Sequence, residues 1–414
     1  MSSLDVRETP GEPPPGISTK FAVLLAVVCG IAVANIYYAQ PLLEEIGNDL
    51  GVGPAGLGFV STVTQVGYFA GLIFIVPLGD LLNRRVLIPI GSVIAAVALV
   101  AVAVSPGPVT FFIASGVVGL ATVVQQVIIA YSAVLSSPES RGRVLGIVTS
   151  GVVIGILLAR TISGLLADAF GWRSVFVVSA LLMLGVALVL GVKLPPELPN
   201  RPSVSYRKLI TSIVTLTARE RVFRVRSLIT LFMFAGFGAL WGSMALPLSA
   251  DPWNLSTSTV GLFGLVGAAG AFGAARAGAL ADRGRAQWVT GITLVLFAVS
   301  WLPIAWLPHS LIPLLIGIVV IDFAGQAIHV TNQHLIVGIN PNASSRLIGS
   351  NMAYYSVGFG GGAVAATTVY SAWGWTAVSI LGAGFSLVAL LIWGVDRISS
   401  ARNAGPALAE TTVS

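Results

Sequence analysis

The sequence predicts an all-α membrane protein whose twelve transmembrane helices form two pseudo-symmetric six-helix bundles. Of the 414 residues, 56% are hydrophobic and only 9% are charged, whereas about a quarter of the residues are charged in a typical soluble domain. The apolar residues form twelve runs, each of about 20 residues, the length that crosses the hydrocarbon core of a bilayer. A long internal repeat relates the second six runs to the first six.

The repeat is clearest between Pro138 and Trp172. Six residues recur at the same spacing 203 residues later (341 − 138 = 203): Pro138, Arg143, Gly146, Gly155, Gly171 and Trp172 correspond to Pro341, Arg346, Gly349, Gly358, Gly374 and Trp375. Each copy contains a polar loop with an arginine, about twenty apolar residues, a Gly-Trp turn and a second apolar run. A repeat of this length predicts two halves of one architecture rather than an array of small units.

The predicted elements follow from the apolar runs in chain order. The spans are 20–43, 55–78, 85–105, 109–135, 144–167, 173–193, 227–249, 257–277, 287–307, 310–335, 346–371 and 374–395. They divide the chain into a disordered cytoplasmic tail (1–19), an N-terminal bundle (20–193), a cytoplasmic linker (194–226), a C-terminal bundle (227–396) and a second tail (397–414). The basic linker either carries a helix on the membrane surface or is simply held at the headgroups by charge.

The distribution of Lys and Arg sets the orientation. Basic residues accumulate in cytoplasmic loops, and all of them except Arg160 and Arg173 fall in alternate loops, in the linker, in the tails or beside these segments. We therefore expect both termini to lie in the cytoplasm. We also expect the protein to be a monomer in the inner membrane. The net charge of +6 does not indicate nucleic-acid binding, because the basic residues are not clustered with aromatics on a soluble face.

The sequence lacks the motifs that are typical of several functional classes. Cys29 is the only cysteine, so a disulfide within the chain and a thiolate metal site are excluded. No phosphate-binding loop for ATP, no nucleophile elbow and no His-Glu-x-x-His pair occurs. We expect no enzyme activity, no cofactor and no metal, and any uphill transport must draw on an ion gradient.

The tenth span carries a polar stripe. Asp322, Gln326, His329 and Gln333 follow one another at i, i+4, i+7 and i+11, which places them on one face of a helix. This face cannot contact lipid, so it should line a cavity between the bundles. Asp322 can then load and release a proton, and His329 can relay it. The alternatives are a structural ion pair between Asp322 and Arg160, and a neutral hydrogen-bonding role for His329.

Arg160 lies in the middle of the fifth span. A guanidinium at this depth costs at least about 2.5 kcal/mol and usually serves an ion, a proton path or an anionic ligand. The alternative is a structural role, in which Arg160 forms a fixed ion pair that joins two helices.

Further polar and aromatic residues in the middle of spans are predicted to complete a substrate site. Such sites combine apolar and aromatic walls with a few polar groups. The predicted set is Asn35, Tyr38, Gln65, Gln126, Trp241, Asn351 and Tyr354. Each of them could instead make a hydrogen bond between helices or lie at the membrane interface.

Small residues predict close helix packing. Gly151, Gly155, Ala159 and Ser163 lie four residues apart in the fifth span, and Gly261, Gly264, Gly267, Gly270 and Gly273 lie three apart in the eighth. Small residues allow helices to approach closely in a membrane. We therefore expect these two spans to pack against each other.

Two loops resemble the signature of a known family. After the second span, Asp80, Arg84 and Arg85 match the Gly-x-x-x-Asp-Arg-x-Gly-Arg-Arg loop of the major facilitator superfamily, and Asp282 and Arg283 match it after the eighth span. Val76, Leu81 and Asn83 depart from the first copy. With the twelve spans and the basic linker, the resemblance covers nearly the whole chain. Residues 35–41 and 64–68 also resemble bacterial efflux permeases.

The resemblance implies a function. It implies a secondary transporter that exports a small organic molecule, such as a drug, a sugar or a metabolite, in exchange for protons, by rocking of one bundle against the other. It also implies that the two loops act as a conformational latch, although Arg84 and Arg85 alone could simply signal topology. In exporters of the family the position of Arg160 holds a proline. The rival interpretations are an uncoupled facilitator and a membrane-embedded receptor or enzyme.

Overall fold

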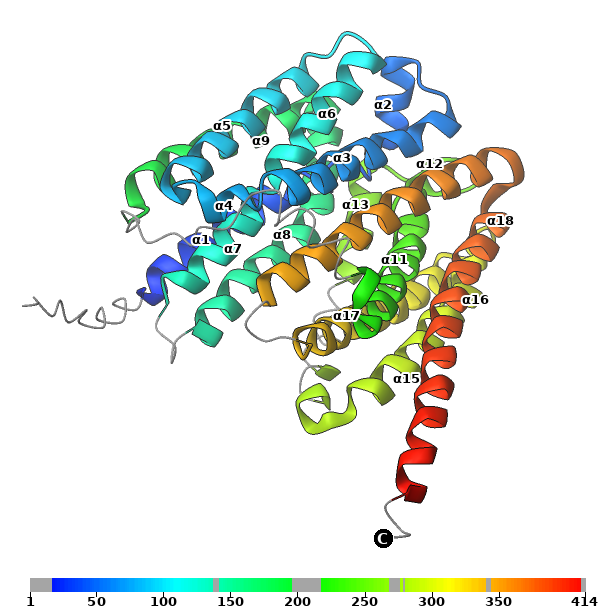
Figure 1. Ribbon diagram of the computed structural model, residues 1–414. Helices are drawn as coiled ribbons and strands as arrows, with labels where there is room; N and C mark the ends of the chain where they lie inside the picture. Colours follow the sequence, from blue (N-terminus) through cyan, green and yellow to red (C-terminus); the bar gives the residue numbers. More distant parts are fainter. Residues whose placement is uncertain are drawn as a thin grey trace, which may run out of the picture.

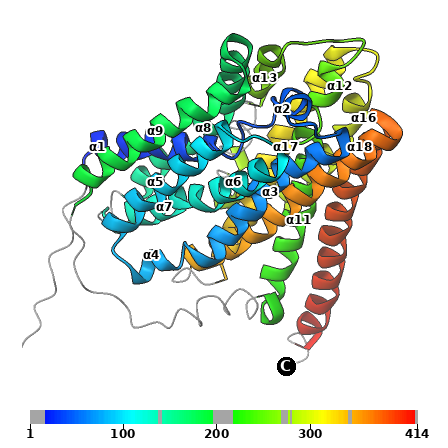
Figure 2. The ribbon, with the colours of Figure 1, turned by 90° about the horizontal axis from the view of Figure 1, so that it is seen from above.

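The computed structural model describes residues 17–136, 141–195, 217–267, 276–277, 280–339 and 344–410. All regular elements in this part of the chain are helices. The views from two directions show α1 to α9 beside α11 to α18, so the chain forms two helical bundles (Figures 1 and 2). The predicted N-terminal tail up to residue 16, most of the linker (196–216) and the last four residues lie outside the described residues.

The described residues of the N-terminal bundle form nine helical segments. Their bounds are α1 Thr19–Ala34, α2 Leu43–Leu50, α3 Pro54–Phe74, α4 Leu78–Leu81, α5 Arg84–Ala103, α6 Pro108–Thr122, α7 Val124–Val134, α8 Arg141–Phe170 and α9 Trp172–Lys193. The first predicted span is shorter than expected because α1 ends at Ala34. The Asn35 side chain donates to the carbonyls of Ile31 and Ala32, and the chain continues in tight turns to Leu42.

The C-terminal bundle repeats the long helices. Their bounds are α11 Arg221–Trp241, α12 Ala245–Ser249, α13 Thr257–Val266, a π-helical turn η1 Ala281–Arg285, α15 Ala286–Val299, α16 Trp301–Ala305, α17 Leu311–Val337 and α18 Ser344–Glu410. A break at Gly374 divides α18 into two helices. The second of these continues beyond the predicted end at residue 396.

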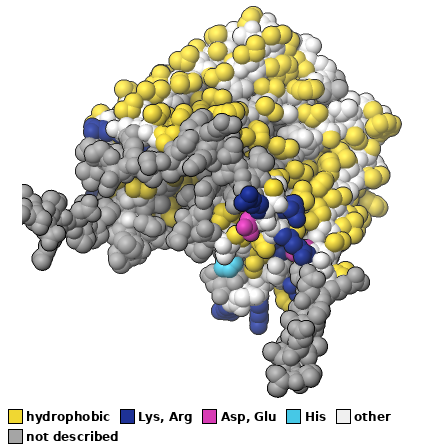
Figure 3. Space-filling view, viewed as in Figure 1, with side chains coloured by type: hydrophobic (Ala, Val, Ile, Leu, Met, Phe, Trp, Pro, Cys, Tyr) yellow, Lys and Arg dark blue, Asp and Glu magenta, His cyan; other side chains and the backbone are white. Residues whose placement is uncertain are grey.

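The described helices agree with twelve spans. Nine segments are long and apolar enough to cross a membrane, and α1 and α13 are shorter apolar helices. Residues 347–399 count as one of the nine, although Gly374 divides them into two helices. Hydrophobic side chains are spread over the upper and right parts of the face in Figure 3, and the described Lys and Arg side chains gather mainly at its lower end. The predicted fold class is confirmed.

The internal repeat also appears in the backbone. Gly171 and Gly374 both have positive φ, 79° and 72°, which a residue with a side chain rarely adopts. Each glycine ends one long helix and starts the next, and each is followed by a buried tryptophan, Trp172 or Trp375. The Gly-Trp turn predicted from the sequence is therefore present in both bundles.

The small residues of α8 pack differently from the prediction. A side chain on Gly151 or Gly155 would lie closer than 3.0 Å to backbone atoms of Ala26 or Gly30 in α1. The two glycines therefore bring α8 against α1 within one bundle. The expected contact with α13 does form, but its glycine is Gly261, which meets the backbone of α8. The prediction was right about the pair of helices and wrong about the face of α8. Gly270 and Gly273 lie outside the described residues.

Candidate functional site

A buried cavity of about 90 Å³ lies between the two bundles. Its position follows from its walls, which come from the turn after α1 and from α8 on one side and from α11, α13, α17 and α18 on the other. The lining residues are Tyr37, Val153, Ile156, Leu157, Arg160, Phe234, Phe237, Trp241, Gly267, Asp322, Gln326, Tyr355 and Phe359. Most of these are apolar or aromatic, with one cation and one carboxylate among them.

Arg160 brings the cation from the N-terminal bundle. Its side chain is buried, with 6% of the residue exposed, and its Nε donates a 2.7 Å hydrogen bond to Oε1 of Gln40. The guanidinium lies 4.0 Å from the ring centroid of Trp241 and 5.2 Å from that of Tyr37. Each such cation–π contact contributes about 2 kcal/mol when it is shielded from water. These contacts offset part of the cost of burying the charge.

Asp322 brings the carboxylate from the C-terminal bundle. It is 7% exposed, and its Oδ2 has no hydrogen-bond partner among the described residues. The ion pairs in the described part of the chain are Arg173–Asp49 and Arg221–Asp396. Arg160 and Asp322 therefore face one cavity without forming an ion pair, and the predicted alternative of a structural pair is not observed.

Two glycines of α13 make room for both charged side chains. A side chain on Gly264 would lie 3.0 Å from Cβ of Arg160, and one on Gly267 would lie 2.9 Å from Oδ2 of Asp322. These distances are shorter than normal carbon contacts. The glycine spacing that predicted helix packing thus also shapes the site.

Tyrosine and glutamine side chains form a polar layer next to the cavity. The hydroxyls of Tyr37 and Tyr355 share a 2.7 Å hydrogen bond across the bundles. Gln65 is 1% exposed, and neither its amide nitrogen nor its amide oxygen has a partner among the described residues. It lies against Gly360 of α18. A buried amide without partners is costly, so Gln65 is suited to bind a polar group.

The remaining predicted glutamine of this region has a partner. Gln126 donates a 2.9 Å hydrogen bond to the hydroxyl of Tyr68, which also accepts from Gln125. Gln126 therefore belongs to the N-terminal bundle and does not line the cavity.

The stripe on α17 is only partly in the cavity. Gln326 lines it beside Asp322. His329 and Gln333 lie further along the helix, where their side-chain nitrogens are 3.0 Å apart. The His329 ring meets the edge of Phe234, and its Nδ1 has no partner among the described residues. The stripe thus leads from the cavity towards the end of α17 at Val337.

Four predicted residues lie away from the cavity. Asn35 accepts a hydrogen bond from Ser179 of α9, and Tyr38 lines a separate groove. Asn351 bonds to Ser227 and Thr230 of α11, and Tyr354 bonds to Thr217. Asn35 and Asn351 therefore connect helices within a bundle, which was their alternative interpretation, and Tyr354 connects α18 to the linker.

Sequence reasoning missed Tyr37 and Gln40 as site residues. Both are buried and touch Arg160. They lie in the turns after α1, in a stretch that the sequence alone could not distinguish from a continuing helix. The available signal was the pair of residues Gln40 and Pro41, because proline disfavours helix at the preceding position.

The groove that contains Tyr38 is larger than the cavity. It has a volume of about 570 Å³ and is lined by side chains of α1, α8 and α9 and by Tyr38. None of its lining residues is charged, and several, including Val27 and Ile154, are half exposed. This groove faces the lipid side of the bundle, so its size does not make it the candidate site.

The bundles are joined on the side opposite the basic loops. Asp168 at the end of α8 accepts a 3.0 Å hydrogen bond from the backbone N–H of Ser258 in the first turn of α13. Glu45 of α2 accepts a 2.9 Å hydrogen bond from the Thr257 hydroxyl. A carboxylate is favourable at a helix N-terminus. These two hydrogen bonds therefore connect the bundles on this side of the cavity.

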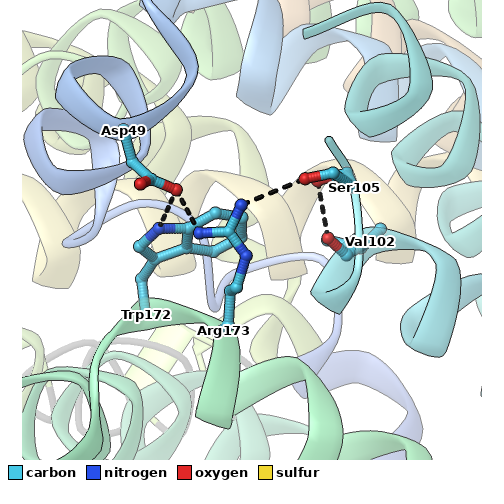
Figure 4. Close-up of polar contacts among 5 residues, drawn as sticks. All are labelled: Asp49, Val102, Ser105, Trp172 and Arg173. Carbon is cyan, nitrogen blue, oxygen red and sulfur yellow. Dashed lines mark hydrogen bonds and ion pairs between the residues drawn. The ribbon is translucent and has the colours of Figure 1, made fainter. Parts of the chain in front are cut away.

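A cluster of polar contacts holds α2 in place on that side (Figure 4). Asp49 of α2 accepts hydrogen bonds from Trp172 and Arg173 at the start of α9, and Arg173 also donates to the carbonyl of Ser105 beyond α5. The Arg173 guanidinium holds the pKa of the Asp49 carboxyl below its usual value. The cluster fixes the helix that carries Glu45.

The predicted latch residues are only partly described. The side chains of Asp80 and Asp282 lie outside the described residues. Arg84 lies over the ring of Tyr131 at 5.8 Å, the backbone N–H of Arg85 donates to Asn83, and Arg283 is exposed. Their gating role stays a prediction.

Comparison with known proteins identifies the family. The family model described as Major Facilitator Superfamily matches residues 23–333 and 227–411. The chain belongs to the major facilitator superfamily. Members of this superfamily are membrane transporters and not enzymes, so the expectation of no enzyme activity is confirmed.

Relatives of this major facilitator include two bacterial transporters. YgaY of Escherichia coli O157:H7 is 40% identical over 378 residues, which cover 91% of this chain and 95% of YgaY. SCO4007 of Streptomyces coelicolor is 35% identical over 402 residues, which cover 96% of this chain and 91% of SCO4007.

Solved structures of major facilitators have the same fold. A bacterial homologue of the human lysosomal transporter Spinster, in an inward-facing and unoccupied conformation, aligns with a TM-score of 0.74 at 17% identity, over 90% of this chain and 96% of that one. The human organic anion transporter MFSD10 aligns with a TM-score of 0.67 at 17% identity, over 91% of this chain and 100% of that one. At these identities the likeness concerns the fold.

Proposed function

We propose that this major facilitator exports a small organic molecule in exchange for protons, with Asp322 as the proton carrier and Arg160 as a substrate ligand. One observation supports the proposal above the others. A carboxylate from one bundle and a guanidinium from the other face the same buried cavity and remain unpaired there. Because each unpaired buried group is costly, each is suited to bind a partner that enters the cavity.

The arrangement supports alternating access around this cavity. When one bundle rocks against the other, Arg160 and Asp322 move relative to each other because they belong to different bundles. Asp322 would release its proton when the cavity opens to the cytoplasm, take up substrate, and be protonated again on the outer side. The contacts of Asp168 and Glu45 with α13 would have to break for that outer opening. The proposal includes the predicted location in the inner membrane with both termini in the cytoplasm. It also includes the monomeric state.

The test is transport by Asp322→Asn in proteoliposomes. A thermal-shift screen of sugars, amino acids and antibiotics on the purified protein first supplies a compound. We expect the variant to lose exchange driven by a pH gradient while exchange of substrate down its own gradient stays measurable. Asp251→Asn, at an exposed loop carboxylate, is the matched control and should behave as the unaltered protein. Unchanged pH-driven transport in Asp322→Asn would remove Asp322 from the mechanism.

An uncoupled facilitator is the second candidate, because the same fold and cavity suit both. The two differ in their response to a protonophore. Proton-coupled export stops when the proton gradient is collapsed, whereas facilitated flux continues. Flux that is indifferent to the protonophore would replace the first candidate with the second.

A further inference from the structure

Among the described residues, the cavity wall holds one cation, Arg160, and one carboxylate, Asp322, and no ion pair joins them. We infer that the substrate is a small zwitterion of the amino acid class, whose carboxylate binds Arg160 while its ammonium group binds Asp322. This inference rests on the proposed function, because it names the substrate class of the same site. It follows from the unpaired atoms, the size of the cavity and the chemistry of its walls.

The Arg160 guanidinium has its terminal nitrogens available. Among the described residues its side chain makes one hydrogen bond, from Nε to Gln40. The guanidinium lies over the rings of Trp241 and Tyr37, and these contacts and the hydrogen bond to Gln40 hold it in place. A guanidinium held in this way binds a carboxylate through two parallel N–H···O hydrogen bonds. Gln40 Nε2, which also lacks a partner among the described residues, adds a donor next to it.

Asp322 presents the complementary acceptor. Its Oδ2 is buried and without a partner in the described part of the chain, and Gly267 approaches it so closely that an added Cβ would lie 2.9 Å from that atom. An ammonium group has three donors and no acceptor, so it matches this carboxylate oxygen, which no donor contacts in the described part of the chain. Gln326 beside it can accept a further N–H.

A ligand with a single charge fits the cavity poorly. While Asp322 is deprotonated, a monoanion on Arg160 would leave the Asp322 carboxylate without an ionic partner and close to a like charge, and a monocation on Asp322 would leave Arg160 in the same position. A zwitterion satisfies both groups and keeps the filled site neutral. Truncating one partner of a buried charge pair typically costs several kcal/mol.

The walls and volume limit the rest of the ligand. Phe234, Phe237 and Phe359 line the cavity and provide apolar contacts but no hydrogen bonds. A cavity of about 150 Å³ holds the six carbon atoms of benzene, so six non-hydrogen atoms are an upper limit for the 90 Å³ space. L-Alanine lies at this limit and has only a methyl side chain, and it is therefore our test ligand.

Zwitterion binding also accounts for the direction of coupling. A proton and an ammonium group compete for the same carboxylate, so substrate and proton bind in turn, as exchange requires. The titratable side chains that face Asp322 across the cavity are Arg160, Tyr37 and Tyr355. The described part of α13 packs on Asp322 through Gly267 and adds no titratable group there.

The experiment compares three ligands of similar size on the purified full chain. L-Alanine carries both charges, propionate carries the carboxylate alone, and ethylamine carries the ammonium alone. Calorimetric titration should show L-alanine binding at least tenfold more tightly than either single-charge compound. Equal affinity for the three compounds, or no binding of L-alanine, would overturn the inference.

Two neutral variants test which charged group of the ligand binds Asp322 and which binds Arg160. Asp322→Asn should remove the preference for L-alanine over propionate, and Arg160→Gln should remove its preference over ethylamine. Asp322→Glu and Arg160→Lys, which keep the charges, should retain part of each preference and report on the site where the neutral variants do not fold. Loss of both preferences in both neutral variants, with unfolding temperatures unchanged, would contradict the assignment.

The inference and the proposed function fail in different ways. If another screened compound is exchanged for protons while L-alanine does not bind, the substrate class is wrong and the proposed function stands. If L-alanine shows the expected pattern but its flux ignores a pH gradient, the coupling is wrong and the recognition of a zwitterion stands.

Discussion

The two bundles share their packing but differ in their charges. Gly155 brings α8 against Gly30 of α1, and its counterpart Gly358 brings α18 against Leu231 of α11. At the position of Arg160, however, the second bundle has Ala363 (363 − 160 = 203), which is fully buried. At the position of Asp322 the first bundle has Gly119 (322 − 119 = 203), which packs against Thr64.

The difference shows which part of the repeat carries architecture and which carries chemistry. Close backbone contacts are needed in both bundles, so their glycines recur. A cavity with one cation and one carboxylate needs each charge only once, so neither recurs. Because each bundle contributes one charge, any rocking motion changes the separation of the two.

Of the variants that test this difference between the bundles, Arg160→Gln should have the largest effect, and the effect is on transport. It removes the one described cation in the cavity wall, and we expect substrate transport to fall by about 100-fold, or about 2.7 kcal/mol. Stability should stay the same or rise, because replacing a buried charge that lacks an ionic partner relieves its desolvation cost. Flux in proteoliposomes and the unfolding temperature measure the two effects. A loss of 3–5 kcal/mol in stability, as expected for a broken buried ion pair, would show a structural role instead.

The glycine contacts should respond equally in both bundles. A methyl group on Gly155 or Gly358 would lie closer than 3.0 Å to a backbone carbonyl. We expect Gly155→Ala and Gly358→Ala each to lower the free energy of unfolding by about 1–3 kcal/mol, the usual cost of overpacking. Gly146 and Gly349 are a matched pair with no atom within 4 Å of an added methyl group. Gly146→Ala and Gly349→Ala should raise the free energy of unfolding by up to about 1 kcal/mol, because alanine is favoured over glycine inside a helix. A cost confined to one bundle would contradict the shared packing.

Replacing the repeated tryptophans should change the free energy of unfolding by amounts that differ only slightly between the two bundles. Trp375 donates a 2.8 Å hydrogen bond to the buried carbonyl of Ile304, whereas Trp172 donates at 3.2 Å to the exposed Asp49. Trp375→Phe should therefore cost about 1 kcal/mol more in unfolding free energy than Trp172→Phe, because a buried acceptor loses its partner. Thermal unfolding of the two variants side by side measures this difference. An equal cost would mean that the two turns do not differ in this hydrogen bond.

The Asp49–Arg173 contact should have the smallest effect, and only the first bundle has it, since Thr376 replaces Arg173 in the second (376 − 173 = 203). Both side chains are about 40% exposed, at 41% and 44%, so solvent limits the contact to less than about 1 kcal/mol. The pKa of Asp49 is lowered in the folded protein, so its contribution is present above the unfolded value of about 3.9 and is lost as pH falls through the lowered pKa. The unfolding temperatures of the unaltered protein and Asp49→Asn should converge at low pH. A gap that widens as pH falls would contradict this linkage.

Most of the fold, but only about half of the candidate site, could be predicted from the sequence. Helix number and the Gly-Trp turns follow from apolar length and from the repeat, which are local properties. Arg160 and Asp322 stood out because charges are rare in such spans. Tyr37 and Gln40 did not, because their role depends on where α1 ends and on which bundle faces them. For the same reason the sequence did not show that Asn351, which is polar and deep in a span, bonds to α11 of its own bundle, or that Tyr354 bonds to Thr217 of the linker.

Counting protons tests the central claim most directly. The compound that the transport assay identifies is added to the purified protein in weak buffer near neutral pH, and the protons released per molecule bound are measured at several pH values. The account predicts release of up to one proton by the unaltered protein and none by Asp322→Asn. Equal release by the two proteins would contradict the claim that Asp322 exchanges its proton for substrate.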